Sequence, residues 1–293
     1  MILHKRIYEI EWFVDLLRQE IMQNSQELLQ VFETYAAEAV FGRHLIEDEL
    51  TNLSSKQKIL EVGAGSLILS CQLQREGFLV TALEPFGDGF DHFRQLQHIV
   101  IGIATKLGCL PQLIDKPAED LNKQNCYDMA FSINVMEHVN DVDRVIKNVI
   151  LALREGASYR FICPNYLFPY EPHFNIPTLF TKSLTEKVFH KAIYNNLTLN
   201  DPLGTWKSLN WITVSSVKRI CTSIDNVNYK MRVDLLSVMI GRVVDDPIFS
   251  ARRSKWLTNI LSLVVFFRLH HLTKLIPQAF QPVIDCNIKR VSL

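Results

Sequence analysis

The chain has 293 residues, of which 48% are hydrophobic and 21% are charged, and its 31 Lys and Arg balance its 31 Asp and Glu. This composition is typical of a globular protein and excludes a disordered or fibrous chain. The charge is unevenly distributed, because residues 1–50 have a net charge of −6 and residues 251–293 have a net charge of +6. A uniformly basic nucleic-acid-binding protein is therefore disfavoured, and we expect no nucleic-acid partner.

The six cysteines are scattered along the chain and form no CxxC pair. Their spacing predicts neither a disulfide framework nor a zinc cluster, and a reducing cytoplasm suits them best. Glu9, Glu11 and Asp15 interrupt the first apolar stretch, so we expect no signal peptide. No His-x-x-x-His or Glu-x-x-His spacing indicates a catalytic metal, and none is expected.

At the N-terminus, apolar residues recur every three or four positions over residues 7–21 and again over residues 32–45. This period predicts two amphipathic helices. We expect them to form an N-terminal helical cap, residues 1–54, with the acidic surplus on its solvated faces.

From Lys58 onward, short apolar strands alternate with helices, which predicts βαβ units and a parallel sheet. Strands are predicted at 58–62, 78–83, 110–114, 128–133 and 158–163, with helices ending near Leu73 and spanning 88–107 and 141–153. Beyond Pro164 we expect a loop rich in proline and aromatic residues. Further helices are predicted at 183–194 and 215–224, and further strands at 229–236 and 283–291.

A glycine turn follows the first predicted strand, in the run Glu61-Val62-Gly63-Ala64-Gly65-Ser66. Glycines at this point let the backbone turn tightly and leave room for a ligand at the carboxyl edge of the sheet. Glu84 ends the next predicted strand, 19 residues after Gly65, where a carboxylate can accept hydrogen bonds from ribose hydroxyls. The pattern predicts a nucleotide-type cofactor.

Two classes of cofactor fit such a turn. A dinucleotide site has a third glycine or an alanine at the position that Ile68 occupies here, which argues against NAD or FAD. Glu61 lies beside the turn, where its carboxylate can pair with a cationic amino group. This favours S-adenosylmethionine, which has an ammonium, a sulfonium and a ribose.

The runs Leu60–Gly65, Leu83–Pro85 and Tyr127–Val139 resemble the class I S-adenosylmethionine-dependent methyltransferases. The similarity is greatest to the small-molecule branch typified by the ubiquinone-biosynthesis O-methyltransferases, and it covers roughly residues 55–165. The resemblance implies an α/β fold with a Rossmann-like seven-stranded sheet, mostly parallel with a terminal antiparallel strand, and helices on both faces. The methyltransferase core then spans residues 55–236, and residues 282–293 supply its final strand.

The resemblance also implies which residues bind S-adenosylmethionine. Glu61, Gly63, Ala64 and Gly65 would line its methionine end, and Glu84 with Pro85 would bind the ribose. Ala118, Glu119 and Asp120 match the segment that reaches the adenine, and Asn134 with Val135 match the stretch that supports the methionine moiety. The chain departs from the family at Leu67, where a third glycine is common.

Two histidines are candidate catalytic residues. His138 belongs to a Glu-His pair similar to that of the family, and it either deprotonates a substrate hydroxyl or only packs beneath the cofactor or substrate. His173 follows the fifth strand in a proline-bounded aromatic loop that either closes over the substrate or is a static surface loop. Because methyl transfer depends mainly on proximity and orientation, no nucleophilic triad is required.

Residues 237–281 form a long insertion before the final strand, and they contain Arg252, Arg253 and Lys255 beside the apolar run 256–267. A basic flank next to an apolar helix face suits the surface of an anionic membrane. The alternative is an inserted helix that is buried against the sheet or in a dimer contact. The twelve-residue run is too short to cross a bilayer, which takes roughly 20 residues.

The sequence therefore predicts an enzyme that transfers a methyl group from S-adenosylmethionine to a small-molecule or lipid-type acceptor, with oxygen as the expected acceptor atom and S-adenosylhomocysteine as the product. We expect it in the cytoplasm, with peripheral contact to the inner face of a membrane through residues 252–276. Two alternatives stay open here: an NAD-dependent oxidoreductase, and a catalytically silent S-adenosylmethionine-binding protein at a membrane.

Overall fold

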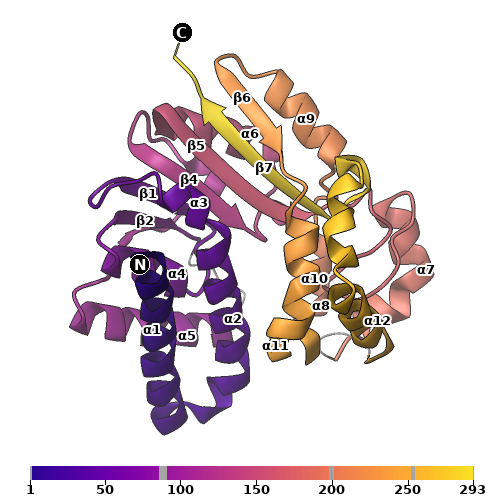
Figure 1. Cartoon of the computed structure of the whole chain (residues 1–293), viewed down its shortest axis with the longest axis horizontal. Coiled ribbons are helices and arrows are strands. Elements are labelled where there is room, and N and C mark those ends of the chain that lie inside the picture. Colours follow the sequence, from indigo (N-terminus) through magenta and orange to yellow (C-terminus); the bar gives the residue numbers. More distant parts are fainter. Residues whose placement is uncertain (1, 86–90, 198, 200, 252–254, 293) are drawn as a thin grey trace. The chain divides into compact units, whose positions relative to one another are not determined.

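The computed structural model describes residues 2–85, 91–197, 199, 201–251 and 255–292. A mostly parallel seven-stranded sheet has the strand order β3-β2-β1-β4-β5-β7-β6 (Figure 1). β1 pairs in parallel with β2 and β4, β2 pairs in parallel with β3, and β7 pairs antiparallel with both β5 and β6. The predicted fold class is confirmed. The strands are β1 (Lys58–Val62), β2 (Leu79–Leu83), β3 (Gln112–Ile114), β4 (Tyr127–Ile133), β5 (Leu153–Pro164), β6 (Val227–Met231) and β7 (Val283–Arg290).

The chain divides into two compact units. The first unit comprises Met1–Ser132 and Leu151–Ala157, and the second comprises Ile133–Ile150 and Ser158–Leu293. The division into cap, core, insertion and final strand that the sequence suggests stays a prediction.

In the first unit, two N-terminal helices, α1 (Ile2–Asn24) and α2 (Leu29–Leu45), pack against each other and against α4 (Ile68–Arg75). α1 also packs against α5 (Asp91–Lys106), and a short helix α3 (Glu47–Leu50) follows α2. The predicted amphipathic period is confirmed in α1, since one face is buried. Its buried members are Ile10, Phe13, Val14, Leu17 and Ile21.

A buried ion pair joins α2 to the end of α4. The Arg43 guanidinium contacts the Glu76 carboxylate through two bonds, from Nε to Oε1 at 2.7 Å and from Nη2 to Oε2 at 2.9 Å. The side chains of Arg43 and Glu76 are 1% and 0% exposed, and Arg43 also donates to Glu47. Each charge is compensated, so the polar contact is compatible with burial.

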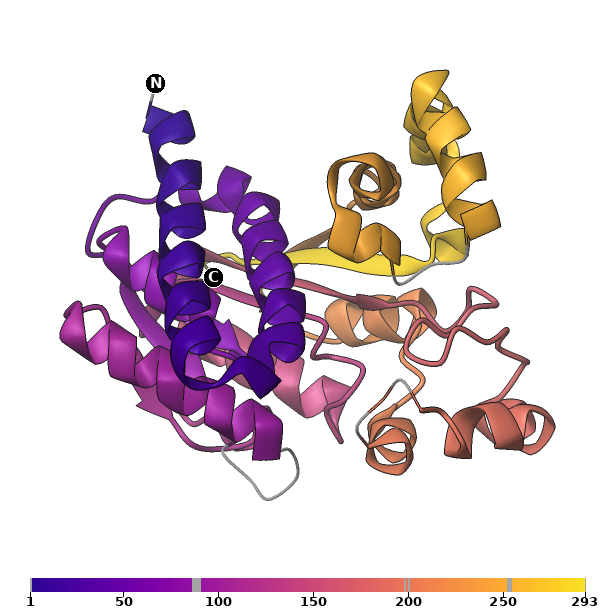
Figure 2. The same ribbon diagram turned by 90° about the horizontal axis from the view of Figure 1, so that it is seen from below.

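The second unit has helices packed around the antiparallel strands. They are α6 (Val142–Ala152), α7 (Lys182–Tyr194), α8 (Pro202–Ser208), α9 (Val214–Thr222), α10 (Leu235–Asp245), α11 (Pro247–Ala251) and α12 (Lys255–Phe266). Figure 2 shows α9 and α10 on opposite faces of the pair formed by β6 and β7. Buried Arg160 on β5 binds Asp285 on β7 at 3.0 and 2.8 Å, and this pair fixes the two strands to each other.

The structure differs from the prediction at several elements, among them the sixth strand and the short helix α8. The sixth strand was predicted at 229–236, but it ends at Met231 and a helix begins at Leu235, because a short apolar run fits either a strand or a helix. α8 was not predicted. It begins at Pro202, and the Asp201 carboxylate caps it by accepting a hydrogen bond from the Gly204 amide at 2.8 Å.

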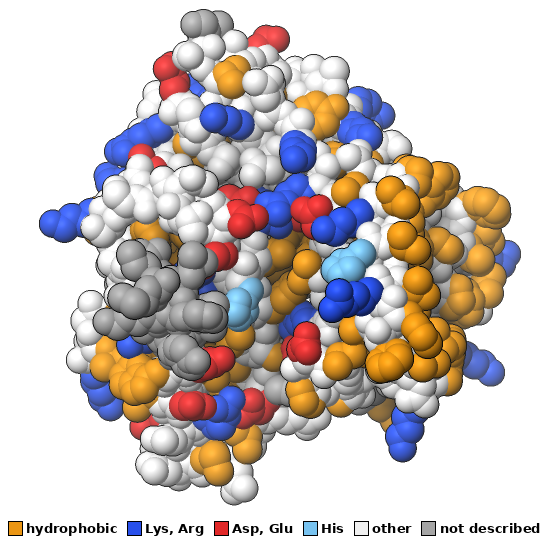
Figure 3. All heavy atoms as spheres, viewed as in Figure 1, with side chains coloured by type: hydrophobic (Ala, Val, Ile, Leu, Met, Phe, Trp, Pro, Cys, Tyr) orange, Lys and Arg blue, Asp and Glu red, His pale blue; other side chains and the backbone are white. Residues whose placement is uncertain are grey.

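The insertion exposes a large apolar surface. No residue of α12 is buried, which excludes the alternative that this helix is buried against the sheet. Figure 3 shows hydrophobic side chains gathered over the region of α12 and the segment that follows it. The largest exposures there include Trp256 at 66%, Phe266 at 78% and Leu275 at 80%. Arg252 and Arg253 of the predicted basic flank lie outside the described residues.

No helix in the described part of the chain combines the length and the apolar character needed to cross a bilayer. All six cysteines are free thiols. Cys71 and Cys109 are buried in the first unit, Cys163, Cys221 and Cys286 are buried in the second, and Cys126 is half-buried.

Candidate functional site

The glycine turn lies between β1 and α4 in the first unit. Gly63 and Gly65 have φ angles of 73° and 52°, in the left-handed region that glycine enters without strain. The amides of Gly63 and Ala64 both donate to the carbonyl of Leu83, at 2.8 and 3.3 Å, which ties the turn to the end of β2. The turn is therefore fixed at the carboxyl edge of the parallel strands, where ligands of such sheets bind.

The backbone conformation at Leu67 shows why glycine is common at this position in the family. Its φ is 66°, so the residue that precedes α4 has the left-handed conformation for which glycine is the usual choice. The Leu67 side chain is 0% exposed. Burial of an apolar side chain here offsets a backbone strain of about 1–2 kcal/mol.

Glu61 lies at the end of β1 with its carboxylate buried. The Ser70 hydroxyl on α4 donates a short hydrogen bond to Oε2 of Glu61. Burial, and then the neighbouring charge of Glu84, raise the pKa of Glu61 to about 8 against the opposing effect of the Ser70 bond. A buried carboxyl of this kind becomes a carboxylate readily when a cation is placed beside it.

Glu84 follows β2 and faces the same turn. Its Oε2 accepts a hydrogen bond from the Gly65 amide at 3.0 Å, and the Gly65 carbonyl accepts one from Nε2 of Gln97 at 2.6 Å. Burial raises the pKa of Glu84, and the Gly65 bond opposes that rise. The predicted residues Glu61, Gly63, Gly65 and Glu84 are therefore brought together, while Pro85 is exposed beside them.

Ala118, Glu119 and Asp120 form a single 3-10 turn shortly after β3. β1, β2 and β3 are parallel, so this segment leaves the sheet at the same edge as the glycine turn and Glu84. Ala118 is buried and Asp120 is exposed. The three residues follow the third strand as the sequence predicts, and their contact with adenine stays a prediction.

The other predicted site residues belong to the second unit. Asn134 has a φ of 56°, a left-handed conformation that asparagine tolerates, and its amide donates to the Ile162 carbonyl at 2.8 Å. Val135 follows it and is half-buried. The turn continues directly into Glu137 and His138, so its backbone conformation places those two side chains.

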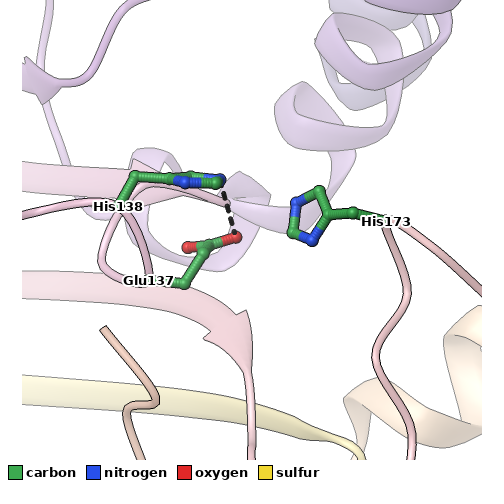
Figure 4. Close-up of side chains that lie close together, drawn as sticks. All are labelled: Glu137, His138 and His173. Atoms are coloured by element: carbon green, nitrogen blue, oxygen red, sulfur yellow. Dashed lines mark ion pairs between the residues drawn. The ribbon is translucent and has the colours of Figure 1, made fainter. Parts of the chain in front are cut away.

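His138 and His173, 35 positions apart in the sequence, lie together in the second unit (Figure 4). Their ring centroids are 5.2 Å apart, and the rings are inclined at 73°. Between them lies the Glu137 carboxylate, whose Oε1 is 4.0 Å from Nε2 of His138. Burial raises the pKa of Glu137 to about 7, whereas burial and then the charge of His173 lower the pKa of His138 to about 4.

Supporting residues were missed by sequence reasoning. Ser70 donates to Glu61 and Gln97 donates to the Gly65 carbonyl of the glycine turn, while Glu171 and Ser208 bind His173 and His138 through bonds of 2.6 and 2.8 Å. Glu171 lies two residues before His173, so its role as the partner of His173 could have been predicted from the sequence. Ser70 is nine positions after Glu61 on α4, whereas Gln97 and Ser208 come from helices farther away in the sequence, and no motif spacing indicates any of the three.

A family model described as a methyltransferase domain matches residues 32–177, about half of the chain, including β1 to β5. The match agrees with the sheet topology and with the glycine turn flanked by two carboxylates. The chain belongs to the class I S-adenosylmethionine-dependent methyltransferases. It is an enzyme of that class, and S-adenosylmethionine is its cofactor.

Among its relatives is the uncharacterized protein Rv1509 of Mycobacterium tuberculosis, which is 42% identical over 281 residues, covering 96% of this chain and 95% of that protein. The ubiquinone biosynthesis O-methyltransferase of Rickettsia conorii is 26% identical over 110 residues, covering 38% of this chain and 36% of that enzyme. The solved phosphoethanolamine N-methyltransferase 2 of Haemonchus contortus aligns with a TM-score of 0.50 and 13% identity, covering 86% of this chain and 52% of that one. At that identity the likeness shows the fold.

Proposed function

We propose that this methyltransferase acts on a small-molecule or lipid-type acceptor and transfers the methyl group to a hydroxyl oxygen. The observation that supports oxygen is the similarity to an O-methyltransferase over 110 residues, together with the two histidines that lie around Glu137. Imidazole and carboxylate groups are suited to binding a hydroxyl and accepting its proton. The family match favours methyl transfer over the NAD-dependent alternative.

The proposed cofactor contacts follow from the two acidic groups of the first unit. Glu61 pairs with the ammonium of S-adenosylmethionine, and Glu84 accepts hydrogen bonds from the ribose hydroxyls. No ion pair is found for either carboxyl among the described residues, so a cationic ligand supplies the compensation that the folded chain lacks. Gly63, Ala64 and Gly65 give the close backbone approach, and residues 118–120 contact the adenine.

The apolar surface of the insertion supports a lipid-type acceptor or a peripheral membrane contact. Apolar side chains of α12 and of the following residues are exposed, and residues 247–284 contain five Lys or Arg and no Asp or Glu. An apolar surface with a net positive charge has the chemistry that binds anionic bilayers.

The cofactor and the acceptor require separate experiments. S-adenosylhomocysteine binding is measured by calorimetry for the wild type, for Glu84→Gln and for Arg219→Glu, an exposed control on α9. We expect binding by the wild type and the control and a weaker affinity in Glu84→Gln. Labelled methyl is then transferred from S-adenosylmethionine to an extract. Base treatment separates labile methyl esters from stable ethers and amines, and retention on a cation exchanger separates the amines from the ethers. A labelled amine as the sole product would contradict the oxygen assignment.

A further inference from the structure

The Glu137 carboxylate is buried without compensation. Its side chain is 0% exposed, and neither Oε1 nor Oε2 has a hydrogen-bond partner in the described structure. An unpartnered carboxylate in this position is unfavourable unless it takes up a proton or faces a cation. Two imidazole rings, those of His138 and His173, lie beside it, and neutral imidazoles are ligands for cations.

The hydrogen bonds of His138 determine which of its nitrogens is available. Ser208 donates its hydroxyl proton to the Thr205 carbonyl at 2.8 Å, so it can only accept from Nδ1 of His138, also at 2.8 Å. The proton of a neutral His138 is therefore on Nδ1, and Nε2 has a free lone pair. This Nε2 is the atom that lies 4.0 Å from Oε1 of Glu137.

His173 has the same arrangement. Its Nδ1 donates to Oε1 of Glu171 at 2.6 Å, and Glu171 also accepts from the Tyr166 hydroxyl at 3.2 Å and from the Phe174 amide at 2.7 Å. Backbone bonds between Glu171 and Ile176, at 2.8 and 3.3 Å, close the short loop that holds His173. With Nδ1 bound to a carboxylate, Nε2 is again the nitrogen left to bind a ligand. Metal-binding histidines are typically oriented by such a second bond.

We propose that Glu137, His138 and His173 bind one divalent transition-metal ion. One ligand atom from each residue lies within 4.8 Å of the other two, as Figure 4 illustrates. Ligand atoms of a tetrahedral Zn²⁺ site are about 3.4 Å apart, so rotations that move these atoms by about 1 Å close the set around an ion. Two imidazoles and one carboxylate suit Zn²⁺, Fe²⁺ or Mn²⁺ and leave a coordination position open, whereas Mg²⁺ and Ca²⁺ prefer all-oxygen ligands.

No metal-ligand spacing along the chain indicates this site, because Glu137 and His138 are adjacent and His173 comes from a separate loop. The fold supplies the third ligand.

The role of the ion rests on the proposed function. A hydroxyl of the acceptor that binds at the open position loses its proton to solvent more readily, because the metal stabilises the resulting oxyanion. The oxygen then forms a bond to the methyl carbon while the bond from that carbon to sulfur breaks, and the electron pair stays on sulfur to give S-adenosylhomocysteine. The acceptors are thereby narrowed to molecules with a hydroxyl oxygen that can ligate a metal.

Metal binding is tested on the full chain after chelator dialysis. Titration of Zn²⁺ by calorimetry is expected to show one site, and the melting temperature of the wild type is expected to rise with Zn²⁺ but not with Mg²⁺. Glu137→Gln and His173→Ala each lose at least about 10-fold in Zn²⁺ affinity. His190→Ala, which removes an exposed histidine from α7, binds as the wild type does.

The visible absorption of bound Co²⁺ distinguishes metal binding from a purely structural role of Glu137, His138 and His173. The wild type is expected to give visible absorption bands of a low-symmetry Co²⁺ site, and Glu137→Gln is expected to lose them while remaining folded, because it removes an uncompensated buried carboxylate. Zn²⁺ binding that is absent, or that is equal in wild type and both variants, overturns the site. Methyl transfer that is equal with and without metal overturns the assigned role and leaves the proposed methyl transfer intact.

Discussion

Five acidic residues with little exposure differ in whether an arginine binds them. Glu76 and Asp285 are each bound by an arginine and serve the fold. Glu61, Glu84 and Glu137 have no such partner among the described residues, and burial raises the pKa of each. Uncompensated acidic groups are unfavourable for folding, so their presence indicates positions that exist for ligands.

Glu61→Gln tests the proposed ammonium contact. Loss of a charge-assisted hydrogen bond is expected to weaken S-adenosylhomocysteine binding about 10- to 100-fold. The ligand-free wild type holds a proton on Glu61 at pH 7, because its pKa is raised to about 8, and the ammonium displaces that proton.

The measurement is calorimetry in buffers of different ionisation enthalpy. We expect the wild type to release up to one proton per ligand near pH 7 and the variant to release fewer. Equal proton release by the two proteins would contradict a role for Glu61. The matched control is Glu11→Gln, an exposed carboxyl on α1 that has no part in the proposed cofactor site.

At the scale of elements, the Arg43–Glu76 pair connects the N-terminal helices to α4. Arg43→Ala leaves the Glu76 carboxylate buried without a cation, and we expect the free energy of unfolding to fall by about 3–5 kcal/mol. The double variant Arg43→Met, Glu76→Gln removes both charges and should recover much of the loss.

Urea denaturation measures both effects. If the single variant were as stable as the wild type, the pair would contribute nothing to the packing of α2 on α4. The control is Arg18→Ala. Arg18 pairs with Glu33, and both side chains are about one-third exposed, so this substitution should lower the free energy of unfolding by less than about 1 kcal/mol.

Because α12 is exposed, replacing its apolar side chains should weaken the proposed membrane binding without affecting the fold. Replacing Trp256 and Phe266 by serine removes apolar side chains that are 66% and 78% exposed, so the fold should be unaffected. Co-sedimentation with anionic vesicles is expected to decrease several-fold, because less apolar surface enters the interface. Charge reversal of Arg252, Arg253 and Lys255 should also weaken vesicle binding. This loss of binding should become larger as the salt concentration falls.

Arg219→Glu on α9 controls for net charge. Vesicle binding that is unchanged in both α12 variants would exclude the membrane contact. A wild type that forms dimers, dissociated by the Trp256 and Phe266 replacements, would instead assign this surface to a second copy of the chain.

For the whole molecule, the position of the strands was the easiest feature to predict. β1 was predicted at its exact bounds. The other parallel strands except β5 were predicted within about three residues at each end, because each is a short, mostly apolar run bounded by turn residues. The glycine turn and Glu84 were predictable because their chemistry is local to the strand ends. Glu137 and Ser208 acquire their roles from partners distant in the sequence, His173 and His138 respectively, and the exposure of α12 could not be read from its apolar residues.

Stability of the ligand-free protein should depend on pH through Glu61. Its folded pKa of about 8 exceeds the ordinary value of 4.5, so between these pH values the folded state binds more protons than the unfolded state. The free energy of unfolding contributed by this group therefore falls as pH rises, by at most about 1.4 kcal/mol per pH unit. Urea denaturation at several pH values should show the stability of Glu61→Gln increasing relative to the wild type from pH 5 to 8, and a constant difference would contradict the raised pKa.

The reactivity of the buried cysteine thiols can report local opening of the structure. Cys71 and Cys109 are enclosed in one unit and Cys163, Cys221 and Cys286 in the other, so an alkylating reagent reaches each only when its surroundings open. Mass-spectrometric mapping of the rate at every cysteine would thus resolve the breathing motions of the two halves without any introduced label. Half-buried Cys126 would be modified first and would calibrate the reagent.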